Sequence, residues 1–160
     1  MATHDDFARV AALTVAAYRT GDLPDDSHYW TYLHDTAQRA GAPNEIWVAQ
    51  LDGLVVGSLT WCPPGSADLD TAEEGECEFR TLAVDPAARG QGVARALVTA
   101  VIDRARSEQL PAIAITTADW MQSAHRLYES LGFVRTPQRD WVIEGQTLLT
   151  YRLALTEPTP

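Results

Sequence analysis

The chain of 160 residues contains no lysine, so all 12 of its basic residues are arginine. A P-loop for nucleotide phosphates requires a lysine after its glycines, and this sequence therefore cannot contain one. Acidic residues number 22, which gives a formal net charge of −10. Because a chain this acidic, without a stripe of basic residues, would repel a phosphate backbone, we exclude nucleic acid as a partner.

Cysteine is also scarce, and long apolar runs are missing from the sequence. Cys62 and Cys77 are the two cysteines, and we expect free thiols in a reducing compartment rather than a disulfide, a metal site or a nucleophile. No apolar run approaches the roughly 20 residues of a membrane span, and the first six residues lack a secretory signal. We therefore expect a cytoplasmic protein with no metal and no membrane partner.

What the sequence does contain predicts one α+β domain over residues 1–155, followed by a frayed tail at 156–160. Hydrophobic residues make up 46% of the chain, which is enough for one core, and the length is too short for two ordinary domains. Apolar spacing predicts helices over 7–18 and 30–40, strands over 45–51, 54–62 and 76–84, and a closing hairpin over 139–143 and 146–155. The acidic segment 63–75 is expected to be an exposed loop with solvated charges.

Residues 82–98 join a strand, a glycine turn and an amphipathic helix without a break. The apolar strand stops at Asp85-Pro86, because proline cannot continue a sheet ladder. Gly90 and Gly92 then allow a tight turn, and the helix that follows begins with N–H groups that have no intrahelical partner. Such a terminus binds anions, so the segment is a candidate phosphate site. It is not a dinucleotide fingerprint, because Arg95 stands where that motif requires glycine or alanine.

This turn, Arg89-x-x-Gly92-x-Ala94, closely resembles the acetyl-CoA motif of the GNAT acyltransferases. The segment 124–133, Ala-His-Arg-Leu-Tyr-Glu-Ser-Leu-Gly-Phe, is similar to the second signature of the same family. The resemblance implies the GNAT fold, a mixed and mostly antiparallel sheet flanked by helices. The first strand of that fold is expected to be short or missing, because only three residues precede the first helix; it is either vestigial or supplied by upstream residues.

The resemblance also implies acetyl-CoA as co-substrate, direct transfer of its acetyl group to an amine, and no metal or covalent enzyme intermediate. By this resemblance, the backbone of Leu82 and Val84 pairs with the pantetheine arm. The full set of implied cofactor-binding residues is Leu82, Ala83, Val84, Arg89, Gly90, Gln91, Gly92, Val93, Ala94, Arg95 and Ser123. Where the family often has an asparagine this chain has Met121, so either Gln122 or Ser123 replaces that contact or the contact is absent.

Two residues are candidates for catalysis. The family's tyrosine at the place of Tyr128 lies near the cofactor sulfur, where a phenol can protonate the departing thiolate; the alternative is a core aromatic. Glu78 stands where some members carry a glutamate that takes the amine proton, and the alternative is a salt bridge to Arg80 or another arginine. Strand alternation predicts Glu78, Arg80, Leu82 and Val84 on one face.

The acceptor pocket of this fold comes from the first two helices and the closing hairpin. Candidate substrate-binding residues, each of which could equally pack in the core, are Tyr29, Trp30, Tyr32, His34 and Trp141. Acidic residues around positions 22–26 and 68–74 favour a cationic amine, unless they only solubilise the surface. The sequence therefore predicts an N-acetyltransferase acting on a small molecule or peptide, as a monomer or homodimer. The alternative is a non-catalytic acyl-CoA-binding sensor.

Overall fold

The structure is a computed structural model that describes residues 1–156, so the predicted tail lies, apart from Thr156, outside the described residues. The helices and helical turns are η1 (His4–Asp6), α1 (Phe7–Tyr18), α2 (Tyr29–His34), α3 (Thr36–Arg39), η2 (Pro86–Ala88), α4 (Val93–Ser107), α5 (Gln122–Ser130) and η3 (Pro137–Arg139). The strands are β1 (Glu45–Leu51), β2 (Leu54–Cys62), β3 (Cys77–Val84), β4 (Ala112–Ala118), β5 (Val134–Arg135), β6 (Trp141–Ile143) and β7 (Gln146–Ala154). None of the helices in the described part is long and apolar enough to span a membrane.

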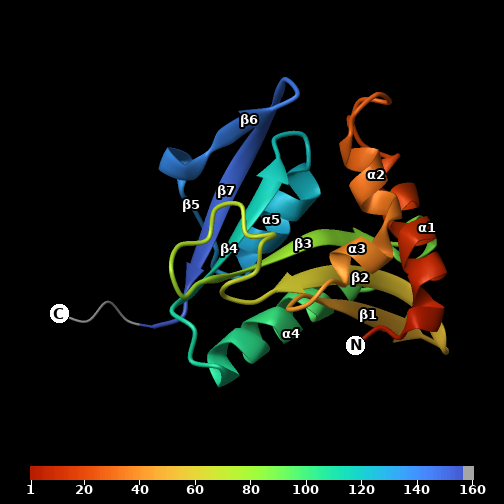
Figure 1. Ribbon diagram of the computed structural model, residues 1–160, viewed down its shortest axis with the longest axis horizontal. Coiled ribbons are helices and arrows are strands. Elements are labelled where there is room, and N and C mark those ends of the chain that lie inside the picture. The colour runs from red at the N-terminus through yellow and green to blue at the C-terminus, as the bar shows by residue number, and fades with distance from the viewer. Residues whose placement is uncertain (157–160) are drawn as a thin grey trace.

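Within residues 1–156 the seven strands form one sheet in the order β1-β2-β3-β4-β7-β5, with β6 paired to β7. All neighbours are antiparallel except β3 and β4. These two strands pair in parallel only where Cys77 meets Ile113 and Glu78 meets Ala114. Beyond Glu78 they diverge, so the sheet opens like a V between β3 and β4 (Figure 1). The facing backbone edges of both strands are thereby left without a strand partner in the opening.

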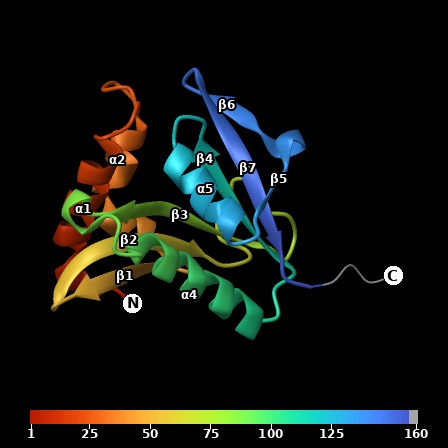
Figure 2. The ribbon, with the colours of Figure 1, turned by 180° about the vertical axis from the view of Figure 1, so that it is seen from behind.

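Helices cover both faces of the sheet. The three N-terminal helices lie on one face, and α4 and α5 lie on the other (Figures 1 and 2). The larger core cluster packs α4 and α5 against the sheet around Phe79, Val98 and Tyr128. A smaller cluster packs Val10 and Leu13 of α1 against the opposite face. The predicted α+β architecture is confirmed, including the mixed, mostly antiparallel sheet with helices on its faces.

The N-terminal segment begins without a strand in the described chain, since residues 4–6 form the turn η1 directly before α1. The N–H of Ala2 donates to the carbonyl of Ile46 in β1 at 2.8 Å. The single helix predicted over 30–40 is wrong, because the segment forms two short helices, α2 and α3, that break at Asp35. The carboxylate of Asp35 accepts the N–H of Gln38 and caps α3.

A bulge in β3 changes which residues share a face. Between the pairs Ser58–Ala83 and Thr60–Arg80, β3 contains one residue more than β2, and Thr81 has a φ of 51°. Arg39 is fully buried and donates to the Thr81 hydroxyl at 2.9 Å, which helps to hold this unfavourable backbone conformation.

The predicted common face for Glu78, Arg80, Leu82 and Val84 is therefore wrong. Glu78 and Arg80 line one cavity, whereas Leu82 and Val84 line another. A one-residue insertion reverses the alternation of every side chain after it, and sequence periodicity cannot reveal such an insertion.

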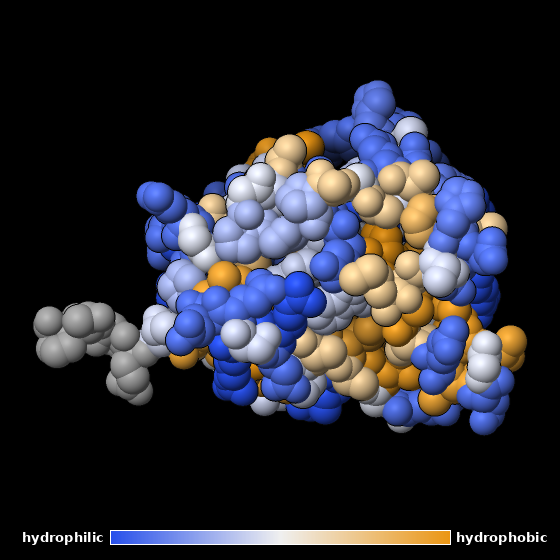
Figure 3. Space-filling view, turned by 60° about the horizontal axis from the view of Figure 1, so that its bottom comes forward, coloured by the Kyte–Doolittle hydropathy of each residue, from blue (hydrophilic) through white to orange (hydrophobic). Residues whose placement is uncertain are grey.

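The surface is mixed in character. Large apolar side chains with substantial exposure include Leu54 at the β1–β2 turn and Val142 in β6. On the face presented in Figure 3, apolar residues gather in its right half and are bordered by hydrophilic residues.

Candidate active site

The glycine turn and the start of α4 form one wall of a groove with a volume of about 720 Å³. Gly90 and Gly92 both have a φ of 77°, and a Cβ added at either would meet no atom within 4 Å. The helical hydrogen bonds of α4 begin with the N–H of Ala96, which donates to Gly92 O at 2.9 Å. The preceding N–H groups at this terminus therefore have no intrahelical acceptor, and they provide donors for an anion.

The structure brings ten of the eleven predicted cofactor-binding residues together along this groove. Gln91 is the exception, because it is exposed at the turn and does not line the groove. Met121, Gln122 and Ser123 all line it, so either predicted replacement for the family asparagine has access to a bound ligand. Ser123 Oγ accepts a hydrogen bond from Arg126 at 3.2 Å.

Two exposed arginines give the groove positive charge in an otherwise acidic protein. Arg89 donates to the hydroxyl of Thr20 at 3.0 Å, and Arg95 donates to Ser130 Oγ at 2.8 Å. Both bonds are to neutral hydroxyl groups, so the guanidinium charges are not cancelled by these partners and remain available to an anionic ligand.

Sequence reasoning missed the opposite wall of the groove, which is formed by residues 20–22 after α1 and by Trp120 after β4. A Cβ on Gly21 would lie 2.0 Å from the Trp120 ring, so only glycine permits the indole to pack on this loop. The two residues are about a hundred positions apart, and nothing local in the sequence indicates that they touch.

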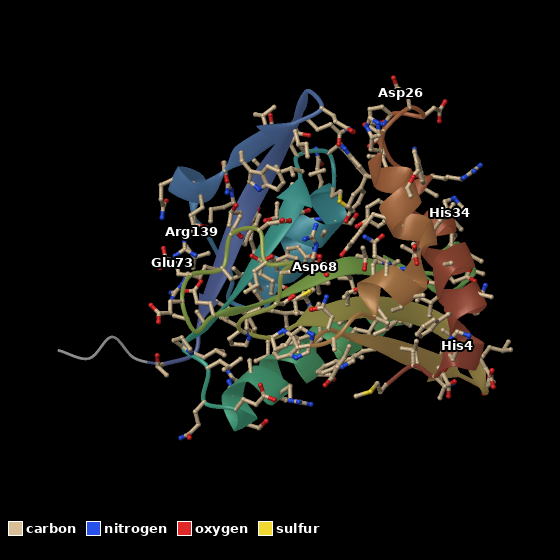
Figure 4. All side chains as sticks on the ribbon, viewed as in Figure 1. His4, Asp26, His34, Asp68, Glu73 and Arg139 are labelled. Carbon is tan, nitrogen blue, oxygen red and sulfur yellow. The ribbon has the colours of Figure 1, made fainter. Side chains whose placement is uncertain are left out.

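A second cavity, of about 350 Å³, opens on the other side of the V. Of the five predicted substrate-binding residues, Tyr29, Tyr32 and Trp141 line it. Trp30 does not, and its indole donates to the carbonyl of Pro24 at 2.8 Å. His34 is exposed on the outer side of α2 and also lies away from the cavity (Figure 4).

The groove and the second cavity meet, since Tyr18, Trp120 and Met121 line both. Tyr18 is the last residue of α1. Burial raises the pKa of its hydroxyl well above the usual value, so Tyr18 is neutral at physiological pH. Any group transferred from a ligand in the groove to a ligand in the second cavity would pass these three side chains.

Glu78 lines the second cavity and is 1% exposed. Its Oε1 accepts the N–H groups of Asp70, Thr71 and Ala72 at 3.1, 2.6 and 2.6 Å. Its Oε2 accepts only the shared N–H of Asp70, at 3.1 Å. The alternative prediction, a salt bridge from Glu78 to an arginine, is wrong. The Glu78 carboxylate instead accepts hydrogen bonds from the backbone of the acidic loop. Oε1 is therefore occupied, whereas Oε2 keeps capacity to accept another proton donor.

The acidic loop is exposed at Asp70, Glu73 and Glu74, as predicted, but the prediction that its charges are solvated is wrong for those paired with arginines. Arg80 binds Asp70 at 3.0 Å and donates to the carbonyl of Asp68 at 2.7 Å. Glu73 forms an ion pair with Arg139 at 2.5 Å, and the two side chains lie next to each other in Figure 4. Burial raises the pKa of Asp70, an effect that Arg80 opposes. These arginines lie far from the loop in sequence or on the next strand, so the composition of the loop alone could not reveal them.

The roof of the second cavity joins the loop before α2 to the closing hairpin. Ser27 donates to Glu144 Oε2 at 2.6 Å, and His28 Nδ1 lies 2.8 Å from Glu144 Oε1. Gln146 donates to the carbonyl of Asp22 at 3.0 Å. Hydrogen bonds from Ser27 and His28 hold the pKa of Glu144 below its usual value, so it is ionised near neutral pH.

Tyr128 lies in the core beside this site, 3% exposed, with its ring packed on Phe79, Phe133 and Tyr151. It lines neither cavity. The hydrogen bonds within residues 1–156 include none from its hydroxyl. Burial raises the pKa of this phenol above its usual value of 10.0. The group is therefore a neutral phenol with an unused proton.

With this geometry in view, comparison with known proteins identifies the family. The sequence model of the Acetyltransferase (GNAT) family matches residues 8–133. The chain belongs to this family, and the GNAT fold predicted from its two signatures is confirmed.

Similar curated proteins include an N-acetylaspartate synthetase from Danio rerio, 36% identical over 103 residues, with 64% of this chain and 34% of that protein covered. N-acetyltransferase 8B from Homo sapiens is 38% identical over 93 residues, with 58% of this chain and 40% of that protein covered. The chain thus spans well under two thirds of the length of these relatives.

Solved structures show the same fold over nearly the whole chain. A Corynebacterium glutamicum structure, described as histone acetyltransferase HPA2 and related acetyltransferase, has a TM-score of 0.75 at 24% identity, covering 99% of this chain and 96% of that one. A Salmonella typhimurium acetyltransferase with its cofactor acetyl-CoA has a TM-score of 0.69 at 21% identity, covering 99% and 94%.

Proposed function

We propose that this chain is an N-acetyltransferase that moves the acetyl group of acetyl-CoA directly to an amine. The observation that carries the proposal is the meeting of two cavities at Tyr18, Trp120 and Met121. One cavity has an anion-binding helix terminus and the other has an aromatic lining, so a cofactor and an acceptor would approach each other from opposite sides of the opened sheet. The relative named N-acetyltransferase 8B supports the same conclusion.

The groove residues suit the parts of acetyl-CoA, which supplies the thioester when bound. The N–H groups at the start of α4 would hold the pyrophosphate, and Arg89 and Arg95 would offset its charge. The edge of β3 is unpaired after Glu78, which leaves the backbone of Leu82 and Val84 for the pantetheine arm to pair with as an added strand.

For the chemistry, we assign one proton transfer to each of two residues. Glu78 Oε2 would accept the proton of the amine, directly or through water, while Oε1 holds the acidic loop in place. The neutral phenol of Tyr128 would protonate the departing thiolate. Its hydroxyl is protonated and has no hydrogen-bond partner within the described residues, and its ring packs on Phe79, which lines the second cavity; these observations support the role.

Assay of thiol release from acetyl-CoA with a panel of amines, followed by mass spectrometry of the products, tests the proposal. We expect one or more amines to gain 42 mass units, roughly the mass of an acetyl group that replaces a proton. Tight acetyl-CoA binding without transfer to any amine would contradict enzymatic activity and favour the alternative, an acyl-CoA sensor.

We propose a cationic amine as the acceptor. Support comes from the cavity, whose charged lining comprises three carboxylates, of Asp70, Glu78 and Glu144, against the single arginine Arg80. The relatives named N-acetylaspartate synthetases instead suggest an acidic acceptor. We place the protein in the cytoplasm, because Cys62 and Cys77 are both free and buried.

A further inference from the structure

An unusual number of the residues that line the second cavity have a buried polar atom without a hydrogen-bond partner. Within residues 1–156, seven buried side-chain nitrogen or oxygen atoms have no hydrogen-bond partner. Four of the seven belong to residues that line this one cavity: Tyr32 Oη, Thr117 Oγ1, Trp120 Nε1 and Trp141 Nε1. Buried polar groups in folded proteins are nearly always bonded, so such a concentration calls for an explanation.

The chemistry of the four atoms identifies what is missing. An indole N–H can only donate, so Trp120 and Trp141 both require an acceptor. The hydroxyl groups of Tyr32 and Thr117 can also donate, and Thr117 is 4% exposed. The lining also contains acceptors, but Asp70 is bound by Arg80 and Glu144 by Ser27 and His28, and none of the described acceptors bonds any of the four atoms. The four atoms around the cavity are therefore left without an acceptor, and an oxygen atom of a bound ligand would supply one.

The charges around the cavity indicate that this oxygen is uncharged. The guanidinium of Arg80 is already bound to Asp70 and to the carbonyl of Asp68, and it lies over the ring of Tyr32 at 5.2 Å. Among the described residues, no other arginine lines the cavity, and His28, which also lines it, is bound to Glu144. A ligand carboxylate would thus face Glu78 and Glu144 without a cation of its own, which is costly in a partly desolvated site.

We infer that the acceptor is a primary amine whose apolar body carries an uncharged hydrogen-bond-accepting oxygen, such as an amide carbonyl, which the indole N–H groups of Trp120 and Trp141 bind. The inference rests on the proposed acetyl transfer and specifies its substrate class. A site built to bond an oxygen rejects an analogue that lacks it, because its buried donors are then left unpaired.

Four related amines test this inference: phenylalaninamide, phenylalaninol, phenylalanine and phenethylamine. The first three carry, in that order, an amide carbonyl, a hydroxyl and a carboxylate next to the amine-bearing carbon, and phenethylamine lacks both this oxygen group and its carbon. We expect kcat/KM for phenylalaninamide to exceed that for phenethylamine at least tenfold, since one unsatisfied buried donor is worth roughly a factor of ten or more. The carboxylate compound should be used less well than the amide.

Variants then connect the preference to the indoles. In Trp141→Phe and in Trp120→Phe, the amide-to-phenethylamine ratio of kcat/KM should fall several-fold. Trp47→Phe is the matched control, because that indole donates to Glu45 and lies outside the cavity; its ratio should match wild type. The ratio also corrects for any loss of folded protein, which would affect both amines alike.

The outcomes separate the inference from the proposed function. Acetylation of all four amines with equal efficiency would overturn the oxygen requirement and leave acetyl transfer intact. A preference for phenylalanine over its amide would overturn the neutral oxygen and support an acidic acceptor. Calorimetry with the same four probes covers the remaining case: if phenylalaninamide binds but no amine is acetylated, the proposed function fails while the binding inference stands.

Discussion

The cofactor groove and the acceptor cavity are built in different ways. One wall of the groove is a nearly continuous segment, residues 82–95, and the donors on this wall are backbone N–H groups at a helix start. The acceptor cavity takes its lining from many segments, and its polar groups are side chains. The segments are the end of α1, the loop before α2, α2 itself, the acidic loop, β3, β4, the turn after β4 and the closing hairpin. Ligand binding in the groove therefore depends mainly on backbone groups, whereas ligand binding in the acceptor cavity depends on side chains.

This difference determines how well each site tolerates amino-acid substitutions. Backbone donors at a helix terminus are present with almost any side chain, provided that the turn before the helix retains its conformation. A cavity made of side chains from many segments can change its specificity at each of them, while the sheet that joins them stays the same. The predictions below test this contrast, from the largest expected effect to the smallest.

Gly92→Glu should eliminate acetyl-CoA binding measured by calorimetry. The substitution places a side chain, and a negative charge, into open space where the anionic cofactor would lie, at a φ of 77° that an L-residue adopts only with strain. Gly53→Glu is the matched control, because it has a φ of 78°, equal open space and a place in the β1–β2 turn away from the groove. Equal loss of binding in both variants would contradict the groove assignment.

Tyr128→Phe should lower turnover by roughly 10²- to 10⁴-fold, the usual value of general acid catalysis, and leave acetyl-CoA affinity unchanged. The ring and its packing on Phe79 are retained, so folding should survive. Because the pKa of Tyr128 is raised, the wild-type rate should show no alkaline decline from this group until above about pH 10.

The control for Tyr128 is Tyr151→Phe. That residue packs on Tyr128, and its hydroxyl donates to Glu129 at 3.2 Å. It should retain turnover, since only a core hydroxyl is lost. If both variants lose turnover alike, disturbance of the aromatic cluster explains the effect and the acid role is contradicted.

The parts of the site that the sequence predicts are those made of contiguous chain, and the parts that it misses are those assembled by the tertiary fold. The turn at Gly90 and Gly92 was recognisable because strand, glycines and helix are contiguous, and local chemistry determines local conformation. Trp120 was missed because its role depends on Gly21, which reaches it only through the tertiary fold. His34 was proposed from its residue type on a predicted helix, but the break at Asp35 and the orientation of α2 leave it outside the cavity.

Glu78→Gln should lower kcat/KM by roughly 10²-fold near neutral pH, because the amine proton loses its acceptor. The rate should recover toward wild type at about pH 9 to 10, where more of the free amine is neutral and needs no base. The variant should also melt at a lower temperature, since the loop amides lose a charged acceptor.

Thr71→Val separates the two roles of Glu78. Thr71 Oγ1 donates to Glu78 Oε1 at 3.2 Å, so this variant loosens the loop and leaves the carboxylate in place. It should retain most of the activity at every pH. If Glu78→Gln shows no recovery at high pH and Thr71→Val loses a similar share of activity, Glu78 acts only as an anchor for the loop.

The smallest expected effect concerns electrostatic attraction of the acceptor. Asp25, Asp26 and Glu74 are exposed, and none of them forms an ion pair within the described residues, whereas Asp70 and Glu73 are paired with arginines. The charge available for steering is thus smaller than the composition of the two acidic segments suggests.

We expect kcat/KM for 1,5-diaminopentane to fall a few-fold from roughly 0.05 to 0.5 M salt, and that for pentylamine to fall less, because salt screens exposed charges. In a double variant, Asp25→Asn with Asp26→Asn, the diamine should lose part of its extra salt dependence. An equal response of both amines, unchanged in the variant, would mean that the acidic surface has no part in choosing the substrate, and that the cavity lining alone determines it.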